Sequence, residues 1–259
     1  MSAYNAAQEV STDREVCEVQ SRLSILLERA ELVQEEVGSF VSSGSRVFIS
    51  SSFQTHSIPL LHIVTQVEPA IPVVFVDTGY HFPETLVFVQ KVAEVLGLNL
   101  QIARSERPKA DQLDSVSRLL FVADPDRCCQ INKVEPLRDY LNDYDVWISG
   151  LRADQSDSRR DLPRLTQGPL GTKKYLPLID WTSQNIELYR EYFELPAHPL
   201  DLGGQLSIGC EPCTDVGPVN LGMPLLQKSP PRDSRWFGME KTECGLHLAS
   251  GFESSASKQ

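Results

Sequence analysis

The hydrophobic pattern begins with a helical stripe near the N-terminus. Apolar residues recur there at alternating steps of three and four: Val16, Val19, Leu23, Leu26, Ala30, Val33 and Val37. This spacing places them on one face of an amphipathic helix, which Gly38 and the serines after it are predicted to end. We expect the stripe to pack on its own domain, and a seam between two subunits of a homo-oligomer is the alternative. Residues 1–12 are expected to be a flexible N-terminus.

Beyond this helix, short apolar runs alternate with helical segments. The runs "RVFIS", "IPVVFVDTG", "LNLQIAR" and "YDVWISG" predict strands, and "IPLLHIVTQV" and "LVFVQKVAEVLG" predict helices. Strand and helix in alternation predict an α/β fold of three layers, with a parallel sheet covered by helices on both faces. We expect one domain over residues 13–225. Residues 226–259 lose the periodicity and end in a serine-rich tail, which predicts a mobile C-terminal segment.

Two polar turns follow the first two predicted strands. They are "SSSFQTHS" at residues 50–57 and "DTGYHFPET" at residues 77–85. Ligands of parallel sheets bind at the carboxyl ends of the strands, where both turns fall. Ser50, Ser51 and Ser52, with free N–H groups at a helix start, suit the oxygens of an anion, although a serine-rich helix cap is the alternative. The turn has neither GxGxxG nor GxxxxGK[ST], which counts against the usual dinucleotide fold and against a Walker NTPase.

The composition of the chain limits the partners and the cellular location that can be expected for it. The 259 residues are 41% hydrophobic and carry a formal net charge of -11, which argues against binding to nucleic acid or to an anionic membrane. No apolar run approaches the roughly 20 residues of a membrane-spanning helix, and the N-terminus lacks the apolar segment of a signal peptide. We therefore expect a cytoplasmic protein whose thiols are kept reduced.

Four of the six cysteines form two compact groups. Cys128 and Cys129 are adjacent, and Cys210 and Cys213 form a CxxC motif. The grouping predicts one four-thiolate site that joins two distant segments. A vicinal pair is unusual for zinc and suits two corners of an iron–sulfur cluster, while a disulfide, a zinc site and buried cysteines without a ligand remain the alternatives. Lys133, one helical turn from Cys129, would bring positive charge to the site.

Basic residues gather in two further stretches, "GLRADQSDSRR" and "PPRDSRW". They contribute Arg152, Arg159, Arg160, Arg232 and Arg235. Arginine forks bind phosphate and sulfate oxygens in pairs, so these stretches are candidates for a dianionic substrate. A solvated face with local salt bridges is the alternative for each of them.

Cys244 stands in the polar segment "EKTECGLHLA", close to Arg235, Lys241 and His247. Nearby positive charge raises the fraction of thiolate, which is the nucleophilic form of cysteine. An exposed thiolate can also be attacked by the thiol of a partner protein. We therefore expect Cys244 to be a nucleophile. Cys17, beside the helical stripe, is expected to be a bystander.

These motifs together resemble a known family. "SSSFQTHS", "VDTGYHFPET", "CC", "NKVEPL", "GLRADQS", "CEPC" and "RWFGMEKTECGLH" resemble the assimilatory adenylyl-sulfate (APS) and phosphoadenylyl-sulfate (PAPS) reductases from about residue 46 to residue 248. The resemblance implies a PP-loop nucleotide-binding domain. The cysteine quartet resembles the branch that carries a 4Fe-4S cluster and generally prefers APS, with Cys128, Cys129, Cys210 and Cys213 as ligands. It also implies that the nucleotide is held by Ser50, Ser51, Ser52, Asp77, Thr78 and Gly79.

The resemblance further implies a reaction. Cys244 would attack the sulfur of APS and expel AMP, and thioredoxin or glutaredoxin, as external reductant, would release sulfite from the resulting thiosulfonate. The residues that match family positions around the phosphosulfate are Lys133, Arg152, Arg232, Arg235 and His247. One departure is Gln54-Thr55-His56, where relatives often have Gly-Ala after the phenylalanine. PAPS reduction, and a zinc-binding PP-loop protein that modifies tRNA or binds nucleotide, are the alternative functions.

Overall fold

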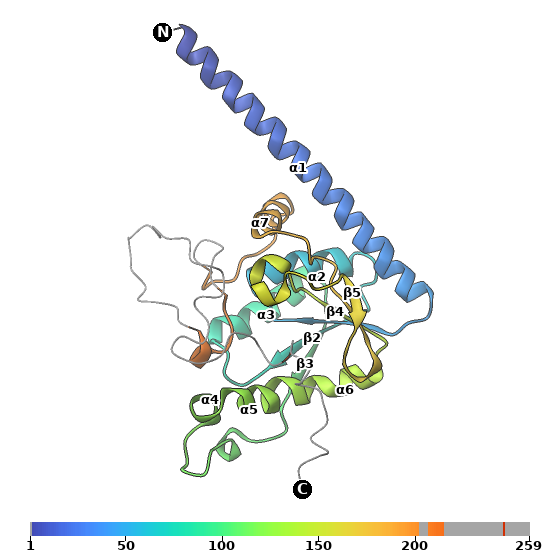
Figure 1. Ribbon diagram of the computed structural model, residues 1–259, viewed down its shortest axis with the longest axis vertical. Helices are drawn as coiled ribbons and strands as arrows, with labels where there is room; N and C mark the ends of the chain where they lie inside the picture. Colours follow the sequence, from blue (N-terminus) through green and yellow to red (C-terminus); the bar gives the residue numbers. More distant parts are fainter. Residues whose placement is uncertain (1, 202–206, 215–245, 247–259) are drawn as a thin grey trace.

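A six-stranded sheet forms the centre of the molecule (Figure 1). The computed structural model describes residues 2–201, 207–214 and 246, with side chains from Cys17 onward. The strand order is β3-β2-β1-β4-β6-β5. The four predicted strands are confirmed as parallel neighbours: β1 (Val47–Ser51), β2 (Pro72–Asp77), β3 (Asn99–Arg104) and β4 (Val146–Ser149). Two strands of three residues were not predicted: β6 (Lys173–Tyr175) parallel to β4, and β5 (Leu165–Gln167) antiparallel to β6.

Alternating side chains of the strands build two separate cores. Val47 and Ile49 of β1 face a cluster that includes α1 (Ser2–Ser42), α2 (Ile58–Thr65), α3 (Pro83–Leu96) and α7 (Ser183–Tyr192). Phe48, between them, faces the opposite cluster with Leu137 and Leu141 of α6 (Glu135–Asp143). Since successive strand residues point to opposite faces, both faces of the sheet are covered by helices. The predicted three-layer α/β fold is confirmed.

Helix α1 is longer than its apolar stripe at both ends. The predicted end at Gly38 is wrong, because the helix continues to Ser42. Gly44, with φ +79°, ends it, and the N–H of Ser45 donates to Phe40 O at 3.1 Å while that of Gly44 donates to Val41 O at 2.9 Å. At Gly38 a Cβ would come 3.6 Å from Val67 Cγ1, an ordinary van der Waals distance, so this position of the helix has room for a side chain.

The two halves of α1 have different surroundings. Leu26, Ala30, Val33 and Val37 are buried in the core, which confirms packing on its own domain for this half, whereas Val19 is 46% exposed. Residues 2–12 lie in the first turns of the helix, and they contain helix-favouring Ala, Gln and Glu and no Gly or Pro; their flexibility stays a prediction. Of the helices in the described ranges, none is long and apolar enough to cross a bilayer.

Candidate functional site at the strand ends

The carboxyl ends of three neighbouring strands meet at one edge of the sheet. β1 pairs in parallel with β2 on one side, through Ser51 opposite Phe75, and with β4 on the other, through Ser50 opposite Ser149. The turns after these strands, at residues 50–57, 77–85 and 150–155, therefore emerge side by side. Parallel topology alone brings three of the sequence motifs together.

In the serine turn, two of the three hydroxyls accept hydrogen bonds from other residues, and the third belongs to an exposed residue. Ser50 Oγ accepts a hydrogen bond from Trp147 Nε1 at 2.7 Å, and Ser51 Oγ accepts one from the N–H of Phe53 at 3.1 Å. Phe53 is fully buried with φ +53°, in the left-handed region that non-glycine residues rarely adopt. Ser52 is exposed and lies 3.3 Å from Ser57 Oγ.

The serine turn is not an ordinary helix cap. Gln54 and Ser57 occupy the N-cap positions of the following 3-10 turn (Thr55–Ser57) and of α2, and neither makes a side-chain capping hydrogen bond. The strained turn thus keeps backbone N–H groups and the Ser52 hydroxyl at the sheet edge. This arrangement suits the recognition of anionic oxygens.

The turn after β2 is held by its own side chains. Asp77 Oδ1 accepts from the N–H of Gly79 at 2.9 Å, and its Oδ2 accepts from Arg104 Nε, also at 2.9 Å. Gly79 has φ +69°. Thr78 is buried, and its Oγ1 accepts from the N–H of Tyr80 at 3.2 Å and lies 3.2 Å from Cys210 Sγ. Asp77 is therefore committed to the turn, while Thr78 faces a cysteine.

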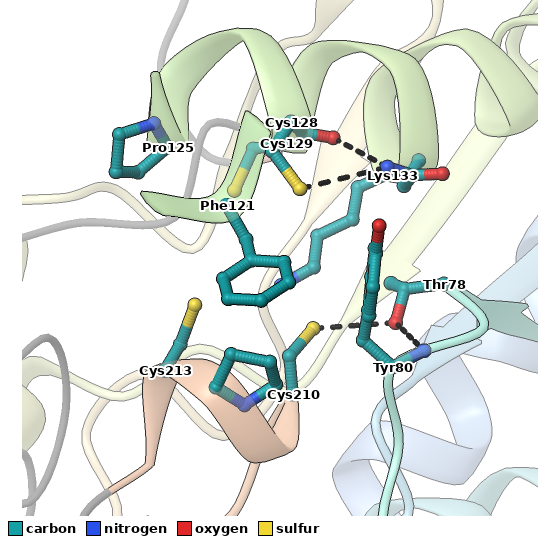
Figure 2. A pocket seen from close by; sticks show the side chains of 11 residues that line it. Thr78, Tyr80, Phe121, Pro125, Cys128, Cys129, Lys133, Cys210 and Cys213 are labelled. Carbon is teal, nitrogen blue, oxygen red and sulfur yellow. Dashed lines mark hydrogen bonds between the residues drawn. The ribbon is translucent and has the colours of Figure 1, made fainter. Parts of the chain in front are cut away.

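The structure brings the two cysteine groups to one pocket. Cys128 and Cys129 end α5 (Pro125–Cys129). Cys210 precedes a 3-10 turn (Glu211–Cys213) and Cys213 ends it, and the N–H of Glu211 donates to Tyr80 O at 2.7 Å. Their sulfurs point across a partly open pocket (Figure 2). All four side chains are almost fully buried, between 7% and 9% exposed.

Polar groups beside the pocket act on these thiols. Burial raises the pKa of the Cys128 thiol, whereas Asn132 and the two lysines Lys109 and Lys133 act in the opposite direction. Lys133 lines the pocket (Figure 2) and belongs to a π-helical turn, Gln130–Val134, that directly follows the cysteine pair. Irregular turns of this kind are frequent at functional sites.

The donor set is chemically suited to a thiolate-bound metal centre. Four soft sulfur ligands, almost fully withdrawn from water and flanked by cations, match the needs of iron–sulfur clusters and of zinc. Within the described ranges, no three His, Cys, Asp or Glu side chains approach one another closely enough to count as ligands of one ion. A multi-metal cluster places its ligands farther apart than one ion does.

Arg152 is buried and does not line the cysteine pocket. Its Nε donates to Asp154 Oδ1 at 3.0 Å and its Nη2 to Ser183 Oγ at 3.0 Å, while Nη1 finds no hydrogen-bond partner among the described residues. Burial lowers the pKa of Arg152, and Asp154 opposes this. Nη1 is therefore a buried donor without an acceptor among the described residues, and it is the guanidinium nitrogen that remains for an anion. By contrast, Arg160 is exposed and pairs with Asp157, as in the alternative reading of a solvated face.

The departure Gln54-Thr55-His56 adds contacts to this region. His56 Nδ1 lies 3.4 Å from Arg152 Nη2, and its Nε2 lies 3.4 Å from Glu187 Oε1 on α7. Thr55 is buried and accepts from the N–H of His198 at 3.0 Å. These larger residues therefore connect the serine turn to the 150–155 turn and to the segment after α7.

Several sequence-predicted residues lie outside the described residues. They are Cys244, His247, Arg232 and Arg235. Leu246, between Cys244 and His247, is described and packs against the cluster that contains Phe48, Val74 and Trp147. Cys17 is exposed on α1.

Two polar residues of the site were missed by sequence reasoning. Asn132 donates from Nδ2 to the carbonyl of Cys128 at 3.0 Å and points at its Sγ, 3.6 Å away. Its place four residues after Cys128 on a helix was a usable signal. Lys109 comes from the irregular segment after β3, where no periodicity indicates what a side chain contacts.

Comparison with known proteins identifies the family. The profile of the phosphoadenosine phosphosulfate reductase domain matches residues 46–216. This chain belongs to that family. The adenosine 5'-phosphosulfate reductase of Rhodococcus opacus is 35% identical to it over 249 residues, which cover 92% of this chain and 97% of the relative. The phosphoadenosine 5'-phosphosulfate reductase of Photobacterium profundum is 41% identical over 209 residues, which cover 79% and 78% of the two chains.

Solved structures agree at the level of the fold. The phosphate complex of phosphoadenylyl-sulfate reductase from Candida auris matches this reductase-family chain with a TM-score of 0.58 and 23% identity, covering 69% of this chain and 88% of that one. FMN adenylyltransferase of Candida glabrata, with FMN and an ATP analogue, matches with a TM-score of 0.55 and 13% identity, covering 86% and 76%. The resemblance drawn from the motifs is confirmed.

Proposed function

We propose that this protein reduces APS to sulfite and AMP in assimilatory sulfate reduction, with thioredoxin or glutaredoxin as the reductant. The observation that carries the proposal is the meeting of both cysteine pairs against the Asp77–Gly79 turn, in a chain of the phosphoadenosine phosphosulfate reductase domain family. APS reductases that carry a cluster need a four-cysteine site beside the turns that bind the nucleotide, and this arrangement agrees with the resemblance to them.

The four thiols of Cys128, Cys129, Cys210 and Cys213 are proposed to hold a 4Fe-4S cluster. When bound, such a cluster supplies charge and rigidity at the edge of the substrate site. The chain contributes the Thr78 hydroxyl next to Cys210, the Asn132 amide next to Cys128, and the ammonium of Lys133 in the pocket.

The substrate would bind at the sheet edge between the buried Arg152 and the half-buried Lys133. The nucleotide would contact the serine turn through backbone N–H groups and the Ser52 hydroxyl, and the Asp77–Gly79 turn beside it. Arg152 offers a guanidinium nitrogen that no other described residue engages, and Lys133 lines the cysteine pocket. Arg232, Arg235 and His247 would complete the anion site from the C-terminal segment, residues 226–259.

Cys244 is the proposed nucleophile. Its thiolate attacks the sulfur of APS, the bond from sulfur to the phosphate oxygen breaks, and AMP leaves with the electron pair. A thiolate of the dithiol reductant then attacks Cys244 Sγ and sulfite departs, after which the second thiol resolves the mixed disulfide. Leu246, two residues after Cys244, packs against the core that contains Phe48 and Trp147.

Mass spectrometry of the reductant-free enzyme tests the nucleophile. Mixing with APS is expected to add the mass of one SO3 group to the peptide that contains residue 244, and Cys244→Ser is expected to abolish both this adduct and sulfite release while iron is retained. An unmodified peptide in an iron-loaded enzyme that still consumes APS would refute the assignment.

PAPS reduction is the second candidate, favoured by the 41% identity to the enzyme of Photobacterium profundum. PAPS carries an additional 3'-phosphate, which needs further cationic contacts. We expect faster sulfite release from APS than from PAPS at equal concentration. A preference for PAPS would overturn the substrate assignment, and a colourless protein that contains zinc in place of iron and sulfide would overturn the cluster.

A further inference from the structure

Lys109 reaches into the cysteine site from the segment that follows β3. Its Nζ donates to the carbonyl of Thr78 and, at 2.6 Å, to Asn132 Oδ1, and it stands 4.2 Å from the centre of the Tyr80 ring. Thr78 contacts Cys210, and Asn132 contacts Cys128. A single ammonium group therefore joins the turn that carries one cysteine pair to the helix that carries the other.

The partner amide of Lys109 is itself held in place. Asn132 is 1% exposed, and its Nδ2 donates to Gln112 Oε1 at 2.6 Å. Gln112, fully buried, donates back to Asn132 Oδ1 at 3.1 Å and to the carbonyl of Arg107 at 2.9 Å. With its oxygen engaged by Lys109 and Gln112, Asn132 presents its N–H donors toward Cys128, since the reversed amide would lose both bonds.

Gly79 provides the room for this lysine. A Cβ placed on Gly79 would come 2.6 Å from Lys109 Cε, so the lysine stem packs directly over the backbone of the turn. The positive φ of Gly79 excludes most other residues as well. The turn after β2 thus gives Lys109 both its space, at Gly79, and one acceptor, at Thr78, and the helix of the cysteine pair gives the second acceptor, at Asn132.

We propose that Lys109 is a positioning residue that assembles the four-cysteine site. Its charge opposes the repulsion among buried thiolates, and its two hydrogen bonds set the separation between the Thr78 turn and the cysteine helix. Without the ammonium, the carbonyl of Thr78 and Asn132 Oδ1 lose a charged donor. The inference rests on the proposed function only in that the four thiols act together as ligands.

Cadmium ion added alone to the reduced, metal-free protein tests this role, because it binds thiolates whether the natural occupant is a cluster or zinc. Cys17→Ser and Cys244→Ser are introduced in all samples so that only the four site thiols remain. Lys109→Met is expected to weaken cadmium binding roughly tenfold or more, as for loss of a charged hydrogen bond. Lys91→Met, at an exposed position on α3, is the matched control and is expected to leave the affinity unchanged.

A double-mutant cycle with Asn132→Ala shows whether Lys109 acts through Asn132. Both substitutions remove the same hydrogen bond, so the combined loss of affinity is expected to be smaller than the product of the two fold-losses. If Asn132→Ala does not fold, the role of Lys109 is tested by the thiolate-to-cadmium charge-transfer absorption of cadmium-loaded Lys109→Met. We expect a weaker absorption band, because fewer thiolates bind the cadmium.

Three results would overturn the role of Lys109: unchanged cadmium affinity in Lys109→Met, independent effects in the cycle, or, where the absorption decides, an undiminished band. Failure of the proposed function looks different. In that case the protein without these substitutions contains no iron or sulfide, while the cadmium affinities still depend on Lys109.

Discussion

Cys128 and Cys17 have opposite surroundings, although both thiols are free. Cys128 is 8% exposed, with the Asn132 amide directed at its sulfur, whereas Cys17 is exposed on α1. A serine oxygen is a poor replacement for a thiolate ligand of iron. Cys128→Ser is therefore expected to lose most of the bound iron and the sulfite release, as measured by iron and sulfide content and by turnover.

Cys17→Ser is the matched control for this substitution. It makes the same chemical change at an exposed position, so iron content and sulfite release are expected to equal those of the unsubstituted protein. A Cys128→Ser protein that kept its full iron content would contradict the ligand set.

Helix α1 packs on the core along one face, so substitutions on its two faces should affect the stability of the protein differently. Val33 is fully buried in the core, while the adjacent Leu32 is 54% exposed. Val33→Ala removes two buried methyl groups and is expected to lower the free energy of unfolding by about 2 kcal/mol. Leu32→Ala, on the same helix, is expected to change it by less than about 0.5 kcal/mol. Urea unfolding measures both, and equal effects would show that this half of α1 is not anchored as described.

His198 links segments that are distant in the chain and makes the whole molecule sensitive to acid. Its N–H donates to Thr55 Oγ1, its Nε2 lies 2.9 Å from Thr85 Oγ1, and its Nδ1 accepts from the N–H of Leu200. Burial lowers the pKa of His198, against the opposing effect of Asp201 and Glu84, and burial also lowers the pKa of His62. The neutral rings therefore contribute stability above the ordinary pKa of histidine, and this contribution is lost as the pH falls.

The melting temperature is accordingly expected to fall as the pH is lowered from about 7 to about 5, the range below the ordinary histidine pKa. His198→Asn is expected to have a lower melting temperature at neutral pH and a melting temperature that depends less on pH. The pH dependence that remains in this variant is expected to come in part from His62. An unchanged slope in His198→Asn would exclude His198 as a source of the pH dependence.

The sequence by itself determined the four main strands, the helices between them and the grouping of the cysteines. Strands such as "IPVVFVD" are buried on both faces, so their composition alone reveals them. The cysteine and serine motifs could also be recognised from the sequence alone, because they are defined by residue type and local spacing.

Only the tertiary structure decided where these motifs meet. β5 and β6 have three residues each and a mixed pattern of exposure, so β4, with which β6 pairs, makes them strands. Gly38 continues a helix because its neighbours stabilise it, in spite of its low propensity. The contacts of Thr78 with Cys210 and of Lys109 with Asn132 join residues far apart in the sequence. Such contacts leave no periodic signal, because they depend on how turns and loops from different strands pack at one edge of the sheet.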